Sequence, residues 1–133
     1  MARRGSSFGF LGRFGRSEDL RSLDAALKTA DLHPALVPEG LKLAISNLMK
    51  DHADDGEPPP HAYPFAASLF AYCLLGPEHF ATVNGADATA EAERRIEAAI
   101  DDADGFDAQL LLLALHSRLI RPEVVEKFGL EIG

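Results

Sequence analysis

Apolar residues recur every three or four positions along most of the chain after residue 16, which is the period of an amphipathic α-helix. The first such stretch begins at Ser17, a favourable helix cap, and ends near Leu32, just before a proline. A second stretch follows Pro38 and continues to about His52. We therefore predict two amphipathic helices here, with the apolar positions Leu20, Leu23, Leu27, Ala30, Leu41, Ala44, Ile45, Leu48 and Met49.

Two later segments, residues 63–75 and 107–120, are apolar nearly all round. A helix without a polar face is buried on several sides. We predict that the first is the central helix of the fold. The second is expected to be another buried helix or one shared across a subunit interface. Shorter or more polar elements are predicted around them: a helical turn over 78–83, an amphipathic helix from Asp87 or Thr89 to Gly105, and a last helix from Arg121-Pro122 to Gly129.

Composition gives the same fold class. By count there are 21 Ala and 19 Leu against 12 β-branched residues, and no stretch alternates apolar and polar positions as a strand would. We predict an all-α protein, a compact orthogonal bundle of five to seven helices with two largely apolar central helices.

Length and composition describe one globular domain. The chain has 133 residues, of which 47% are hydrophobic, and its mean hydropathy is −0.04. We expect an acidic helical domain over 17–133, preceded by an arm over 1–16. No apolar run is long enough to span a membrane. A single cysteine excludes an internal disulfide, and we expect a cytoplasmic protein.

Charge is unevenly distributed along the chain. Residues 1–16 contain four arginines and no acid, a charge of +4, whereas the other 117 residues contain 9 basic and 21 acidic groups, a charge of −12. A body this acidic repels DNA, RNA and anionic membranes. We therefore expect no nucleic acid among the partners.

The N-terminal arm combines these arginines with aromatic residues. Leaving a phenylalanine in water forgoes roughly 1.5–3 kcal/mol relative to full burial. We interpret the segment as a docking arm for its own body, a second copy or a protein partner. The alternatives are a flexible tail with a chance cluster of phenylalanines, or contact with a membrane or nucleic acid. The candidate interaction residues are Phe8, Phe10, Leu11, Arg13, Phe14 and Arg16.

An acidic, proline-rich segment over 53–60 separates the second helix from the central one. Three consecutive prolines favour extended backbone. We interpret the segment as a solvated linker, with a partner-binding loop as the alternative.

No catalytic or metal-binding pattern is present. There is no Gly-x-Ser-x-Gly, no Cys-x-x-Cys and no pair of histidines at helical spacing, so we expect no cofactor, no metal and no catalytic residues. Cys73 lies in the most apolar helix, where a thiol behaves as a small hydrophobe with a raised pKa. If a ligand pocket exists between 63–75 and 107–120, then Tyr72, Cys73 and His116 would supply its polar contacts.

Two acidic segments, Ala53-Asp-Asp-Gly56 and Asp102-Ala-Asp-Gly105, are similar to segments of small acidic helical proteins of the tellurite-resistance B type. That resemblance implies a metal-binding helix after the Asp-Gly pair. The helices after Gly56 and Gly105 carry almost no acids, so the metal ligands do not carry over and no family is assigned.

The sequence as a whole favours a non-enzymatic interaction protein that self-associates, with a homodimer expected, and docks through its N-terminal arm. The alternative is a small-ligand-binding protein or an enzyme without a recognisable motif, with its pocket between 63–75 and 107–120.

Overall fold

The computed structural model describes residues 18–130, and these form seven α-helices, one 3₁₀ turn and no strand. The prediction of an all-α bundle is therefore confirmed for this part of the chain. The N-terminal arm and the capping role of Ser17 lie outside the described residues. In chain order the elements are α2 (Glu18–Thr29), η1 (Pro34–Leu36), α3 (Glu39–Asp51), α4 (Ala62–Leu75), α5 (Pro77–Asn84), α6 (Ala86–Ile100), α7 (Phe106–Ser117) and α8 (Pro122–Phe128).

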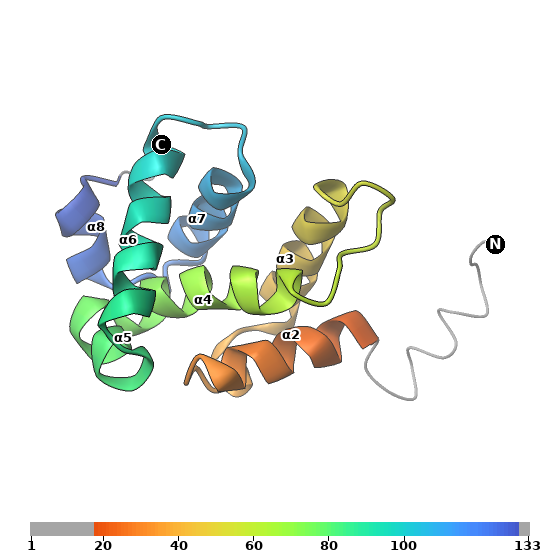
Figure 1. Ribbon diagram of the computed structural model, residues 1–133, viewed down its shortest axis with the longest axis horizontal. Coiled ribbons are helices and arrows are strands. Elements are labelled where there is room, and N and C mark those ends of the chain that lie inside the picture. Colours follow the sequence, from red (N-terminus) through yellow and green to blue (C-terminus); the bar gives the residue numbers. More distant parts are fainter. Residues whose placement is uncertain (1–17, 131–133) are drawn as a thin grey trace.

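Helix α4 is the centre of the bundle, as its apolar sequence predicts. It packs against α2, α5, α6 and α7, and Figure 1 shows α3, α6 and α7 running crosswise to it. The side chains of Ala66, Leu69 and Phe70 are at most 1% exposed. Small Ala and large Leu or Phe alternate along the helix, which lets neighbouring helices approach closely on several sides.

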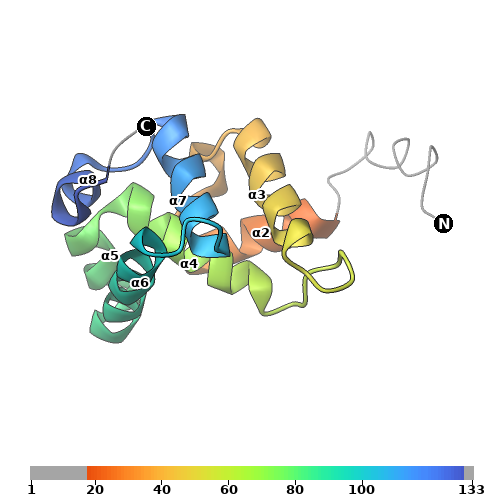
Figure 2. The same cartoon turned by 90° about the horizontal axis from the view of Figure 1, so that it is seen from above.

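Helix α7 is less buried than its sequence predicts. One side, formed by Leu110, Ala114 and Leu115, packs into the core, but Leu112 is 43% exposed. Helix α7 packs against α3, α4 and α6, and these described helices cover only part of its circumference (Figure 2).

Several breaks between helices are set by glycine or proline. Gly76 separates α4 from α5 with φ 91° and ψ 162°, a conformation that side chains with a Cβ rarely adopt, and Pro77 then begins α5. The peptide N–H of Arg121 donates to the carbonyl of Cys73 at 2.8 Å, which holds the start of α8 against the end of α4.

One buried ion pair joins the first two helices. Lys42 of α3, 4% exposed, contacts Asp24 of α2 at 3.0 Å between Nζ and Oδ1. Lys42 precedes Ile45 by three residues and Met49 by seven, so it lies at the edge of the apolar stripe, and pairing with Asp24 offsets the cost of burying its charge. No helix among the described residues is both long enough and apolar enough to cross a bilayer.

Candidate functional site

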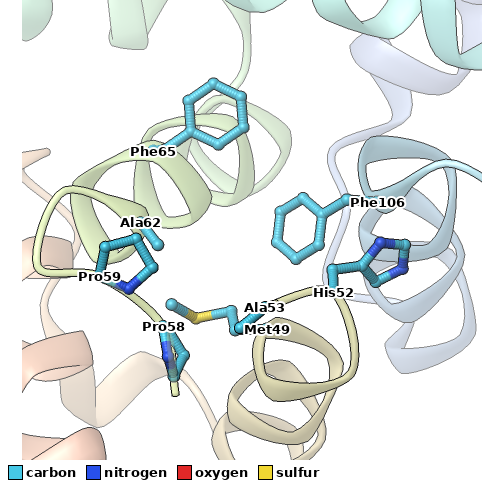
Figure 3. Close-up of a pocket in the computed structure, with 8 residues that line it drawn as sticks. All are labelled: Met49, His52, Ala53, Pro58, Pro59, Ala62, Phe65 and Phe106. Atoms are coloured by element: carbon cyan, nitrogen blue, oxygen red, sulfur yellow. The ribbon is translucent and has the colours of Figure 1, made fainter. Parts of the chain in front are cut away.

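An apolar pocket of about 160 Å³ lies where α3 ends and where α4 and α7 begin. Figure 3 shows the rings of Phe65 and Phe106 on one side, with the two prolines of the α3–α4 loop across from Phe106. We call this the α3–α4–α7 pocket. It is lined by Met49, His52, Ala53, Pro58, Pro59, Ala62, Phe65 and Phe106.

The α3–α4 loop builds one wall of this pocket. Gly56 takes φ 78°, which turns the chain back, and the N–H of Glu57 donates to Asp55 Oδ1 at 3.0 Å. Pro58 is buried against the pocket, and the N–H of Ala62 donates to the carbonyl of Pro59 at 2.9 Å as α4 begins. The loop expected to be a solvated linker is therefore partly packed, although its acidic side chains are exposed.

Arg95 of α6 fixes the two phenylalanines. Its Nε and Nη2 donate to both carboxylate oxygens of Asp107 at 3.0 and 2.8 Å, and Asp107 is adjacent in sequence to Phe106. Nη1 donates to the carbonyl of Phe65 at 2.9 Å, and the guanidinium carbon lies 3.5 Å from the centroid of the Phe65 ring. One side chain thus holds the backbone and the ring of Phe65 together with the start of α7.

His52 supports the Phe106 ring from the other side. The two rings meet edge to face with their centroids 5.5 Å apart, and His52 Nε2 lies 3.4 Å from Oε1 of Gln109. Gln109 Nε2 in turn donates to the carbonyl of Asp104 at 3.2 Å. These contacts join the end of α3 to the first turn of α7.

The edge of the pocket along the α3–α4 loop is acidic. Four exposed acids occur between residues 51 and 57, and no lysine or arginine occurs among them: Asp51, Asp54, Asp55 and Glu57. The pocket therefore offers an apolar surface that can receive a ring. The acids beside it can attract a positively charged group.

The first described helix begins beside the same pocket. Asp19 of α2 accepts a hydrogen bond from the hydroxyl of Tyr63 at 2.8 Å and pairs with Lys50 Nζ at 2.9 Å. Lys50 and Tyr63 are the sequence neighbours of Met49 and Ala62, which line the pocket. Figures 1 and 2 both place the start of α2 at the end of the molecule that carries the α3–α4 loop.

The pKa of Asp19 reflects these contacts. Burial by itself would raise it, but the hydrogen bonds from Lys50 and Tyr63, with the charge of Lys50, leave the pKa below the ordinary value of 3.8. The carboxylate is therefore ionised at neutral pH and anchors the start of α2.

A second, larger cleft of about 680 Å³ lies between α5 and α8. The basic side chains of the cleft lie beside acids. Arg121 Nη2 pairs with Glu123 at 3.1 Å, and His79 Nε2 lies 3.8 Å from Asp31. Lys127 Nζ lies 3.6 Å from Glu93. These pairs reduce the charge that the cleft could direct at a ligand.

The three residues predicted for an inter-helical pocket are not brought together. Tyr72 and Cys73 are at most 1% exposed inside the core, and His116 lies on the surface of α7. The hydroxyl of Tyr72 donates to Glu93 at 2.7 Å, and burial followed by this bond raises the pKa of Tyr72. Cys73 is buried, as predicted for a core residue, and this burial raises the pKa of its thiol to about 12.

Arg95 and the α3–α4–α7 pocket were not identified from the sequence. Asp107 is not simply a solvated acid at the start of its helix, because it is 21% exposed and bound to an arginine that is 8% exposed. The exposed pair Glu91 and Arg94, in contrast, has the ordinary i,i+3 spacing of a helix surface. A signal for the buried arginine was present, because Arg95 lies between Ala92 and Ala99 on the apolar stripe.

Within residues 18–130, no group of three or more His, Cys, Asp or Glu side chains is placed to hold a metal ion. The candidate arm residues Phe8, Phe10, Leu11, Arg13, Phe14 and Arg16 lie outside the described residues.

Comparison of the chain with protein-family models, with curated proteins and with solved structures finds no match in any of the three.

Proposed function

We propose that this chain is a cytoplasmic, non-enzymatic interaction protein whose helical domain receives a short protein segment that carries an aromatic ring and nearby arginines. The observation that carries the proposal is the α3–α4–α7 pocket, which is apolar inside and acidic along one edge. Self-association through this contact, with the N-terminal arm as the ligand segment, gives the expected homodimer.

The size of the pocket supports a single ring as its occupant. An apolar cavity of about 150 Å³ is sufficient to bind benzene, whereas sites for larger organic molecules measure about 300–1,000 Å³. The α3–α4–α7 pocket, at about 160 Å³, matches the first class. A phenylalanine side chain presented by a peptide fits this volume.

The chemistry of the lining also supports binding rather than catalysis. Of the eight lining residues only His52 has an ionisable side chain, and its ring is engaged by Phe106 and Gln109. The small-ligand alternative has weaker support, because Tyr72, Cys73 and His116 do not share a cavity and the basic side chains of the α5–α8 cleft lie beside acids.

Light scattering after gel filtration tests the proposal. We expect the full chain to be a dimer at high protein concentration, and we expect the double substitution Phe10→Ser with Phe14→Ser to shift it to the monomer. The matched control is Leu36→Ser, which removes a side chain that is 61% exposed and lies outside the pocket. The proposal is contradicted if the full chain stays monomeric at every concentration, or if the arm variant and the control have the mass of the unmodified chain.

A further inference from the structure

We propose that the α3–α4–α7 pocket has a resident ligand within its own chain: the ring of Phe10 or Phe14, docked between Phe65 and the loop prolines. This inference rests on the proposed function and goes further by naming the occupant. It also implies a regulatory step, because a partner or a second copy must displace this ring before it can bind.

The described chain begins next to the pocket. Asp19 is bound to Lys50 and Tyr63, so the chain enters α2 beside the pocket. Each extended residue covers at most about 3.3–3.6 Å, so Phe14, four residues before Glu18, can reach about 14 Å and Phe10 about 28 Å. These are the greatest distances from Glu18 at which the two rings can dock.

The pocket and the N-terminal arm are chemically complementary. The pocket volume suits one aromatic ring, and phenylalanine is the aromatic residue that the arm supplies three times. With Phe10 docked, Arg13 and Arg16 are the residues between the ring and the start of α2. They would then pass the acidic edge formed by residues 51–57.

At low protein concentration the arm is expected to dock on its own chain and not on a second copy. A short tether holds a ligand near its site at an effective concentration of about millimolar. The arm of a separate molecule at micromolar concentration is about a thousandfold more dilute than the tethered arm, so it does not displace it. Exchange of arms between two chains at high protein concentration then produces the dimer of the proposed function by domain swapping.

Tryptic cleavage and a fluorescent reporter test the inference in the full chain at dilute concentration. Cleavage after Arg13 and Arg16 is expected to be at least about tenfold slower than in the pocket-filling variants Ala62→Leu and Ala53→Leu. The chain has no tryptophan, so Phe10→Trp and Phe14→Trp each place a single reporter in the arm. The docked reporter is expected to emit at shorter wavelength and to be shielded from acrylamide, and Ala62→Leu is expected to abolish both effects.

Ala90→Leu is the matched control, because Ala90 is exposed on α6 and does not line the pocket. Shielding in a monomer that is lost on filling the pocket, but not in this control, supports the inference. Shielding that persists after filling means that the arm docks elsewhere and overturns it. Shielding found only in the dimer identifies the second copy as the occupant, which overturns the inference and leaves the proposed function standing. An exposed reporter in a chain that never dimerises overturns both.

Discussion

Arg95 is the residue on which the geometry of the candidate site depends. Its guanidinium binds Asp107 of α7 and both the carbonyl and the ring face of Phe65 of α4, so this one side chain of α6 joins three helices. Phe65 itself is 46% exposed, so core packing alone does not hold it in place. A surface aromatic residue that is fixed by a buried arginine is preorganised for contact with a ligand.

Replacing Arg95 by methionine is expected to lower the free energy of unfolding by about 2–4 kcal/mol, because Asp107 loses its partner and Phe65 loses its support. Arg94→Met is the matched control on the same helix. Arg94 is 67% exposed and pairs with the exposed Glu91, so its loss is expected to lower the free energy of unfolding by less than about 0.5 kcal/mol. Urea denaturation followed by circular dichroism measures both.

A second substitution tests the cause of this loss. If the unpaired carboxylate is responsible, Arg95→Met with Asp107→Asn recovers part of the stability lost in Arg95→Met alone. Equal stability losses in Arg94→Met and Arg95→Met would show that the buried pair has no special role.

Individual residues differ in how far the sequence reveals them. Cys73 is buried as predicted, because its neighbours along α4 are apolar and the helix packs against others on several sides. Arg95 was not, because an arginine beside an apolar stripe is usually solvated at its charged end. Its burial depends on Asp107, twelve residues away, and periodicity does not report a contact between two helices.

Among the elements, helices and their breaks follow the local sequence closely. Proline at the start of α5 and α8, and glycine after α8, end or begin helices where predicted. The role of the α3–α4 loop was not predicted. Its prolines become a pocket wall only because α7 brings Phe106 to the same place, and that pairing is set by packing rather than by the loop's own sequence.

The contact between Asp19, Lys50 and Tyr63 joins the starts or ends of three helices, and its strength is expected to depend on pH. Because the pKa of Asp19 is lowered on folding, the carboxylate contributes stability that is present above about pH 3.8 and is lost as the pH falls through the lower folded pKa. Asp19→Asn is expected to lower the free energy of unfolding by about 0.5–1 kcal/mol near neutral pH. The difference should disappear once the pH is below both the folded and the unfolded pKa of Asp19.

Urea titrations at a series of pH values test this expectation, with Glu18→Gln as the control. Glu18 is exposed at the same end of α2, so its substitution removes the same charge from the helix N-terminus without breaking the contact with Lys50 and Tyr63. A stability difference between Asp19→Asn and the unmodified chain that does not shrink on acidification would contradict the assignment.

At the scale of the whole molecule, charge and position act together. The sequence shows that a +4 segment precedes a −12 body, but it does not show which part of the body the segment meets. The fold adds that the start of α2, the acidic loop and an apolar pocket lie at one end of the described molecule. Such an arrangement depends on how four helices cross, which the one-dimensional pattern leaves undetermined.

If Arg13 and Arg16 pass the acidic loop, salt should release the arm. Raising the ionic strength from about 0.01 M to about 1 M shortens the Debye length from about 30 Å to about 3 Å and screens exposed charges. In the Phe10→Trp chain, we expect acrylamide quenching to rise with salt. Arg13→Gln with Arg16→Gln should start from a higher quenching and respond less to salt. The control Arg3→Gln with Arg4→Gln removes the same charge on the far side of the docked ring, and its quenching should still rise with salt almost as in the parent chain. If quenching responds equally to salt in the two double variants, only the overall field of the body attracts the arm.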